Sequence, residues 1–460
     1  MRSVGRGVLA LVIACLVVLG AAAAERIGPA PLGAAERGSA VSSVWLCPHG
    51  GGPGWKGTIA LADPGPTPAD VRLTELGTGA PDPPVTLTVP AGHEVLQQVR
   101  SGSTANATYV EVFGGWIAAG WVLNGGKDVD GLAAEPCAPT GDASLAVVDA
   151  DTDQHQRSLV VVMNPFSVEA VFDVALFRPK LPPIRSADWT DLTLGPGRSM
   201  SLNIGTKLLG QPVVGVQVEA SRGRVAASSL SWGADGGIRS VLAAPIGSTT
   251  WYLPVAQGAN QSTLQVLVPG SDGAQLTTEL LSSEAEPTGA GTAADTQQPG
   301  ASSAGYEIIT NGAASVDVSS AAGVPIAAAL RATGRGGDDA ATGGTAAPAR
   351  AWVVTPTTGP EVPRPGLVVV NPGTAPVQVT LRLLTAGTDT RAPTTTITVP
   401  GQRAVSAPAG FLRQAPAASV LVTGDGDVVA LGASTAGGRR GLGLYASAIG
   451  IPVPLEAGAL

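Results

Sequence analysis

The chain has 460 residues, of which 44% are hydrophobic and only 13% charged, with 62 glycines and 38 prolines. This composition is too apolar for a disordered chain and too rich in turn-forming residues for a helical one. The net charge of −8 argues against a nucleic-acid-binding protein, which needs a basic face.

The N-terminus has the pattern of an export signal. Arg2 and Arg6 precede an apolar stretch, Val8 to Gly20, and Ala22 to Ala24 provide small residues of the kind that precede a cleavage site. The apolar run also approaches the ~20 residues that a membrane-spanning helix needs. We therefore expect residues 1–24 to be either a cleaved signal peptide or a retained membrane anchor. In both cases the rest of the chain is extracytoplasmic, with residues 25–43 as a tether.

A strand–turn–strand unit is the clearest local pattern in the chain. At Leu367 to Leu384 a buried run ends at Asn371-Pro372-Gly373, and residues of alternating polarity follow, as in a half-buried strand. Similar units surround Pro64, Pro165 and Pro269, so that successive units lie roughly 100 residues apart.

Two further landmarks recur in the same order. A proline–glycine corner follows three of the units, at 89–92, 194–197 and 399–401, and an apolar strand pair closes all four. Landmarks in one order at nearly constant spacing indicate a fourfold repeat. We predict β repeats at residues 44–137, 138–248, 249–349 and 350–460.

A unit of about 100 residues is long enough to close its own hydrophobic core. The first repeat shows about seven short alternating segments, the number expected for an immunoglobulin-like β-sandwich. The sequence therefore predicts an all-β chain of four tandem immunoglobulin-like sandwiches. The alternative is a β-propeller in which each repeat forms two blades. Segments 283–304 and 334–349 of the third repeat are rich in small residues and are predicted to be mobile loops.

Cysteine usage agrees with export. Cys15 lies in the signal segment, which leaves Cys47 and Cys137 at opposite ends of the first repeat. A single pair of cysteines in an exported protein predicts one disulfide bond.

The acidic motif Asp149, Asp151 and Asp153 has the alternating carboxylates that begin a calcium-binding loop. Gln154 stands where such a loop needs glycine, and Val160 where it needs glutamate. The three aspartates are therefore weak metal candidates, and an acidic turn is the preferred interpretation. We expect no cofactor.

His49 and the three glycines after it resemble the oxyanion loop of lipases and esterases. That chemistry also needs a G-x-S-x-G serine elbow, and this pentapeptide does not occur in the sequence. We interpret the motif as a turn and assign no catalytic residue. Trp55 and Trp189 lie outside the repeating strand pattern, so they are candidates for a sugar-binding platform, with core packing as the alternative.

These motifs carry two resemblances. The repeat, with its Asn-Pro-Gly turn and Val-Pro-Ala-Gly corner, is similar to immunoglobulin-like modules of bacterial surface proteins. The whole chain resembles a family of actinobacterial exported or anchored proteins of unknown function, through its signal segment, its Trp45 to Pro48 start and its repeated Asn-Pro unit. The resemblance implies a compartment and an architecture, but no activity.

The sequence thus favours a non-enzymatic scaffold or binding protein of the cell envelope. Its expected partner is an envelope protein or a cell-wall glycan, with an N-terminal membrane anchor if the signal segment is retained. One alternative is an array of cell-wall carbohydrate-binding modules. Another is a hydrolase whose site lies between repeats.

Overall fold

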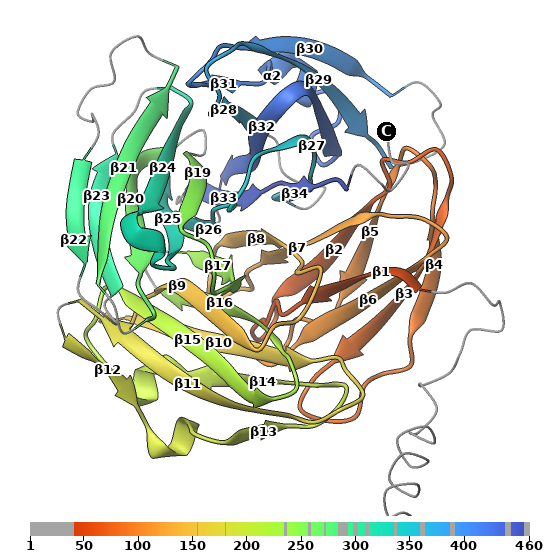
Figure 1. The fold of residues 1–460 in the computed structure, drawn as a ribbon. Coiled ribbons are helices and arrows are strands. Elements are labelled where there is room, and N and C mark those ends of the chain that lie inside the picture. The colour runs from red at the N-terminus through yellow and green to blue at the C-terminus, as the bar shows by residue number, and fades with distance from the viewer. Residues whose placement is uncertain are drawn as a thin grey trace, which may run out of the picture. The chain divides into compact units, whose positions relative to one another are not determined.

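Alternating apolar and polar residues place most of the described chain in β-strands (Figure 1). The computed structural model describes residues 41–153, 155–179, 181–233, 237–255, 259–270, 273–283, 293–297, 302–308, 312–334, 338–358, 364–386, 392–437 and 443–454. Residues 41–460 form one unit, separate from residues 1–40. The predicted signal segment and most of the tether lie outside the described residues. Within the described part, none of the helices has the length and apolarity needed to span a bilayer.

The first segment of the chain contains eight strands. They are β1 (Val41–Cys47), β2 (Lys56–Ala62), β3 (Ala69–Leu76), β4 (Val85–Val89), β5 (Glu94–Val99), β6 (Ala107–Phe113), β7 (Ala118–Asn124) and β8 (Leu132–Pro136). They form two antiparallel sheets, β1-β6-β3-β4 and β5-β2-β7-β8. Seven of these strands match the segments expected from the sequence, and β8 is additional.

The second segment contains ten strands and two 3₁₀ helices. These are β9 (Ser144–Ala150), β10 (Gln156–Asn164), β11 (Ala170–Arg178), β12 (Leu181–Arg185), η1 (Ala187–Trp189), β13 (Leu192–Leu194), β14 (Arg198–Asn203), η2 (Ile204–Thr206), β15 (Val214–Arg222), β16 (Ala226–Gly233), β17 (Ile238–Leu242) and β18 (Ala244–Pro245). One sheet has the order β14-β10-β16-β17, and the other runs β12-β11-β15-β9-β18 with β13 also on β11.

The third segment again forms two four-stranded sheets, β19-β24-β21-β22 and β23-β20-β25-β26. Its elements are β19 (Thr250–Val255), β20 (Ala259–Leu267), β21 (Ala274–Ser282), β22 (Ala293–Gln297), β23 (Ser302–Ile308), β24 (Ala314–Ser320), η3 (Ala321–Gly323), β25 (Ala327–Gly334) and β26 (Asp339–Gly343). Strand β22 lies within 283–304 and β26 within 334–349. These two ranges, which we expected to be loops, therefore contain paired strands.

In the fourth segment one long strand takes part in both sheets. The elements are β27 (Ala349–Val354), β28 (Arg364–Asn371), β29 (Val377–Leu384), β30 (Thr394–Val399), β31 (Arg403–Ser406), α2 (Ala409–Leu412), β32 (Ser419–Gly437), β33 (Gly443–Ile449) and β34 (Ile451–Pro452). The first half of β32 pairs with β27 and β29, and its second half pairs with β28 and β33.

The same pairing scheme recurs in all four segments. The first strand of each segment pairs with a later strand that also pairs with the third, as β1 and β3 pair with β6. Strand β7 pairs with β2 and β8, whereas the seventh strand of a constant-type immunoglobulin domain pairs with the sixth. All sheets of the described residues are open, and none closes into a barrel or propeller.

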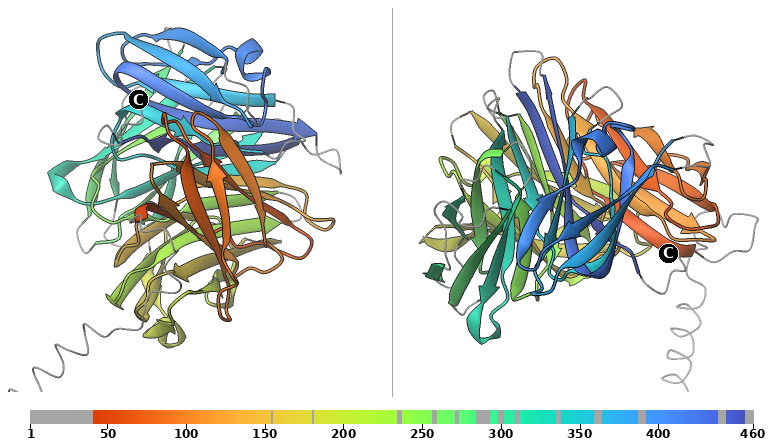
Figure 2. Two further views of the ribbon diagram at one scale, coloured as in Figure 1. Left: turned by 90° about the vertical axis from the view of Figure 1, so that its right-hand side faces the viewer. Right: turned by 90° about the horizontal axis from the view of Figure 1, so that it is seen from above.

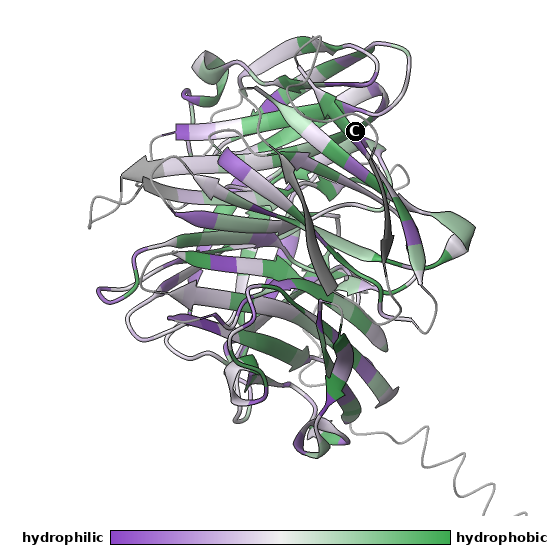
Figure 3. Cartoon of the chain, turned by 90° about the vertical axis from the view of Figure 1, so that its left-hand side faces the viewer, coloured by the Kyte–Doolittle hydropathy of each residue, from purple (hydrophilic) through white to green (hydrophobic). Residues whose placement is uncertain are grey.

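Each segment encloses a hydrophobic core between its two sheets. In the second segment, for example, Val147 of β9, Val160 of β10 and Val216 of β15 belong to one buried cluster. Hydrophobic and hydrophilic residues alternate along many strands in Figure 3, as expected for strands with one buried face. Each segment therefore buries its own apolar faces.

The Asn-Pro turn joins the two sequence landmarks of a segment. The Asn371 side-chain amide donates hydrogen bonds to the carbonyl oxygens of Ala375, at 2.7 Å, and of Val399, at 3.1 Å, next to the proline–glycine corner. Its side-chain oxygen accepts a hydrogen bond from the Gly373 N–H at 2.9 Å. Asn164 makes the corresponding three bonds in the second segment. The recurring motif is thus structural, because a buried side-chain amide satisfies the carbonyl groups of the turn and of the neighbouring strand.

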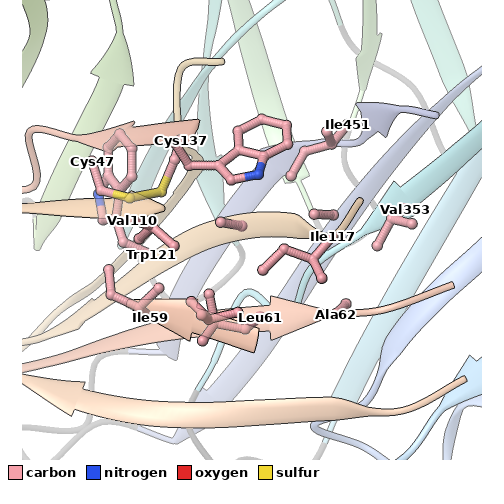
Figure 4. Packing of buried hydrophobic residues seen from close by; sticks show 14 of the residues in the cluster. Cys47, Ile59, Leu61, Ala62, Val110, Ile117, Trp121, Cys137, Val353 and Ile451 are labelled. Carbon is pink, nitrogen blue, oxygen red and sulfur yellow. A yellow bond between two sulfur atoms is a disulfide. The ribbon is translucent and has the colours of Figure 1, made fainter. Parts of the chain in front are cut away.

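The first and fourth segments lie side by side, as Figure 2 shows from two directions in orange and blue. Val353, Leu384, Leu421 and Ile451 of the fourth segment belong to the same buried cluster as Trp121 of the first. Figure 4 shows Val353 and Ile451 beside the residues of the first segment. The two ends of the described chain therefore share one core.

The predicted disulfide bond is present. The sulfur atoms of Cys47 and Cys137 are 2.03 Å apart, and both side chains are buried (Figure 4). Leu46, next to Cys47 at the end of β1, also forms an antiparallel bridge with Ala138. The bond therefore ties the first strand of the segment to the residues that follow its last strand.

Candidate functional site

One strand near the end of each segment meets its counterparts from two other segments. Strand β8 contacts β17, β17 contacts β26, β26 contacts β33, and β33 contacts β8 (Figure 1). Strands β8, β26 and β33 contain several alanine or glycine residues, whose small size allows backbones to approach closely. At the β8–β17 contact, a side chain on Gly131 would place its Cβ atom 2.4 Å from the Ile238 nitrogen, so only glycine fits there.

A cavity of about 590 Å³ lies beside this junction. The residues that line it come from all four segments, and some of them belong to or follow these four strands. Examples are Pro136, Leu242, Gly343 and Ile451. Its volume is in the range of pockets that bind small molecules, about 300–1,000 Å³.

The mouth of the cavity is rich in proline. The exposed residues among its lining are Pro139, Thr140, Pro245, Ala346, Pro452 and Pro454. They follow β8, β17, β26 and β33 in the chain, and proline is common where a strand ends because it lacks an N–H for the ladder. The cavity is therefore open to solvent beside the residues that follow these strands.

Three tryptophans contribute to the wall. Trp45 and Trp116 contact edge to face, with ring centroids 5.9 Å apart. The Trp251 indole N–H donates a 2.7 Å hydrogen bond to the carbonyl oxygen of Ile326, which fixes the orientation of its ring. Trp45 and Trp251 are buried, whereas Trp116 is half-buried. The wall thus presents large apolar ring surfaces whose orientation is fixed, and such surfaces contribute strongly to ligand binding.

Glu135 of β8 is the one ionisable side chain among the described residues of the lining. It is 1% exposed, and neither carboxyl oxygen has a well-aligned hydrogen-bond partner among the described residues. Burial raises the pKa of Glu135 well above its usual value, although the nearby Leu242 and Gly343 backbone and the Thr342 hydroxyl oppose this shift. Burial therefore favours the protonated, neutral form of this carboxyl group.

Two of the three aspartates that were candidate metal ligands form ion pairs with arginines. The Asp149 carboxylate contacts Arg239 at 3.2 Å and Arg331 at 2.5 Å, and Asp151 contacts the same two guanidinium groups at 3.4 and 3.0 Å. Asp153 is exposed at the surface. Arg239 belongs to the second segment and Arg331 to the third, so this ion cluster joins neighbouring segments. In the described part of the chain, no group of three or more potential metal ligands is found.

The His49 loop is part of the first core. The His49 side chain is buried, and its ring nitrogens contact the Gly50 carbonyl oxygen and the Thr108 hydroxyl. Burial lowers its pKa to about 4, so the ring is neutral at physiological pH. Gly51, at φ 151°, has no room for a side chain because a Cβ atom would lie 2.0 Å from the Ser101 carbonyl oxygen. The loop acts here as a tight turn.

The other candidates are dispersed. Trp55 is 7% exposed and stacks edge to face against Trp232 of the second segment, and Trp189 is 6% exposed in the core of its own segment. Neither presents an open platform for a sugar. Of the two histidines other than His49, His155 lies on the surface, and His93 contacts the Thr385 carbonyl oxygen of the fourth segment.

None of the residues selected from the sequence as candidates for chemistry lines the cavity, apart from the disulfide cysteine Cys137. Trp45 and Trp251 could be noticed from the sequence, because a tryptophan lies near the start of three of the four predicted repeats. Their place in the cavity wall could not. Glu135 lies two residues before Cys137 in an otherwise apolar stretch. An isolated acid in such a stretch is a signal that could have pointed to this place, but the sequence analysis did not select it.

Comparisons with known proteins place part of this region in a family. A model described as a family of unknown function, DUF5719, matches residues 111–360. No curated protein matches the chain. A solved structure described as a tetra-tandem repeat in the extending region of a large adhesion protein is 14% identical over 85% of this chain and 92% of its own. Its TM-score of 0.11 is too low to support an argument about fold or function.

Proposed function

Since this chain belongs to the DUF5719 family of unknown function, whose model matches more than half of its 460 residues, we propose that it is a non-enzymatic binding protein of the cell envelope. In this proposal the four segments are repeats of one β-sandwich unit, and their assembly creates a binding site that no single repeat has. The observation that carries the proposal is the cavity to which all four segments contribute.

The lining of the cavity supports binding over catalysis. Acid–base or nucleophilic chemistry needs a nucleophile and a base, or a pair of acids, within hydrogen-bond reach of a substrate. The described lining offers Glu135 with no second ionisable group beside it. The small hydroxyl residues of the lining, Thr140, Ser248 and Thr345, have no histidine or lysine among the other lining residues to activate them.

The disulfide bond supports an extracytoplasmic location. Structural disulfides persist in oxidising compartments, and the Cys47–Cys137 bond is buried in a core, as a structural bond is. This agrees with the export signal expected at residues 1–24, which makes the mature protein either secreted or anchored at the membrane by its N-terminus.

A carbohydrate-binding array is the second candidate. It rests on the tryptophans, since aromatic faces bind sugar rings. The burial of Trp55 and Trp189 weakens this candidate, because a sugar platform requires exposed rings. A hydrolase whose site lies between repeats is the third candidate and has the buried Glu135 as its main support.

Sedimentation with isolated cell envelope tests the proposal. We expect residues 41–460 to bind whole envelope saturably and without releasing soluble products. Purified peptidoglycan and arabinogalactan serve as separate samples. Binding to these glycans alone would favour the carbohydrate-binding candidate, and release of soluble fragments would show a hydrolase. Absence of saturable binding to any fraction would contradict the proposed function.

A further inference from the structure

The chemistry of the cavity lining restricts the class of ligand. Glu135 is the only ionisable residue among the described lining, and the remaining side chains are mostly alanine, valine, leucine, isoleucine, proline and tryptophan. A charged ligand group would lose its hydration in such a cavity without gaining an opposite charge, which is strongly unfavourable. The part of the ligand that enters the cavity is therefore uncharged.

The lining also offers few directional contacts. The Trp251 N–H is already bonded to Ile326, and the Trp45 indole nitrogen is buried away from solvent. The carboxyl oxygens of Glu135 are likewise shielded, so they do not form an open polar subsite. A ligand that depends on several hydrogen bonds, such as a free sugar, would leave its polar groups unpaired in this cavity. The lining fits a hydrocarbon better.

The mouth differs from the interior in its access to water. Six lining residues that follow β8, β17, β26 and β33 are exposed, and one of them, Thr140, provides a hydroxyl group. A polar head group can remain hydrated at this position while an apolar tail enters. The cavity volume of about 590 Å³ is too small for a folded partner and is suited to a single chain or ring system.

We propose that the cavity at the junction of the four segments binds the hydrocarbon tail of an amphiphile, whose polar head group stays at the proline-rich mouth. This inference deepens the proposed binding function and rests on it. The driving force is removal of the tail from water, which contributes about 0.8 kcal/mol for each buried methylene.

A series of alkyl maltosides tests the proposal, with residues 41–460 and each detergent below its critical micelle concentration. Isothermal titration calorimetry with hexyl, octyl and decyl maltoside should show one site per chain. Complete burial predicts an affinity gain of up to about 15-fold for each pair of added methylenes. Maltose, which has the head group without the tail, should not bind.

Two matched glycine variants locate the site. Gly343 lines the cavity, and a Cβ atom there meets only ordinary contacts, at 3.8 Å or more, so Gly343→Leu adds a side chain without a backbone clash. It should weaken decyl maltoside binding by about tenfold, because the added side chain occupies ligand space. Gly79 is exposed with open space around it, and Gly79→Leu should change the affinity by less than about twofold.

The outcomes separate this inference from the broader function. Binding of maltose as strong as that of decyl maltoside, or no gain with tail length, would overturn the hydrocarbon site. Equal effects of the two glycine variants would also overturn it. The wild-type chain-length series decides the matter even if Gly343→Leu fails to fold. Saturable binding to envelope without any effect of tail length would refute the hydrocarbon ligand while leaving the binding function in place.

Discussion

Glu94 of β5 and Ser419 of β32 form a buried contact across 325 residues of sequence. One carboxyl oxygen of Glu94 accepts hydrogen bonds from the Ser419 backbone N–H at 2.8 Å and from its hydroxyl at 2.7 Å. Glu94 is 3% exposed. Nearby, Arg382 donates a hydrogen bond to the Pro64 carbonyl oxygen. The first and fourth segments are thus joined by polar contacts as well as by their shared core.

This contact predicts a pH dependence of stability. Burial raises the pKa of Glu94 to about 8, while the Ser419 hydrogen bonds oppose the shift. Because the folded pKa is higher than the unfolded value of 4.5, the stabilising contribution is complete below pH 4.5 and is lost as pH rises through 8. We expect this group to remove about 1.4 kcal/mol of unfolding free energy between pH 7 and pH 9. Asp63, whose pKa burial raises to about 6, contributes mainly at lower pH.

Urea unfolding of Glu94→Gln at several pH values measures this effect. The amide keeps an oxygen that can accept from Ser419 but does not ionise, so the variant should lose less stability than wild type between pH 7 and pH 9. Parallel pH profiles for the two proteins would show that Glu94 is not the group responsible.

We expect truncation of the Arg239 side chain to lower the free energy of unfolding strongly. It is 1% exposed and contacts Asp149, Asp151 and Asp339 at 3.2 to 3.4 Å. Arg239→Ala leaves buried carboxylates with fewer partners and should destabilise the fold by about 3–5 kcal/mol. Arg222→Ala removes an exposed ion pair with Glu169 and should cost less than about 1 kcal/mol. Equal effects in chemical denaturation would refute a structural role for the cluster.

The same cluster predicts the response to calcium. Both guanidinium groups contact the Asp149 and Asp151 carboxylates, and calcium binding would have to break these four ion contacts. Millimolar calcium should therefore leave the melting temperature unchanged, as should addition of a chelator. A calcium-dependent rise in melting temperature that Asp153→Ala abolishes would restore the loop as a metal site.

The disulfide bond predicts a loss of stability on reduction. The bond closes a loop of 90 residues, so its removal should cost about 2–5 kcal/mol. Urea unfolding of a Cys47→Ala/Cys137→Ala double variant measures this cost. Thiol titration of the unreduced, denatured chain 41–460 should find no free cysteine, and two free thiols would show that the bond does not form.

Local features of the fold were predictable from the sequence, and contacts between segments were not. The alternation of Val377, Val379, Leu381 and Leu383 predicted strand β29, because a half-buried strand imposes a period of two. The Asn371 turn followed from equally local chemistry, and the disulfide followed from the single pair of cysteines outside the signal segment. Strand β8 was missed because Leu132 to Pro136 is buried throughout and shows no alternation.

The candidate site depended on information that a linear pattern lacks. Leu242, Gly343 and Ile451 are separated by about 100 residues each, and none has an unusual local sequence. They line one cavity because whole segments pack against one another, which is decided by surface complementarity over many small residues. Similarly, the acidic motif at Asp149 gave no indication that Arg331, 182 residues later, would neutralise it.

Hydrogen exchange measured by mass spectrometry tests the central claim most directly, namely that four distant segments share one binding site. On addition of decyl maltoside, we predict slower amide exchange in β8, β17, β26 and β33 and in the connections that follow them, all with the same ligand concentration dependence. Maltose should leave these regions unchanged. Slower exchange confined to a single segment, or at sites away from the junction only, would contradict a shared cavity.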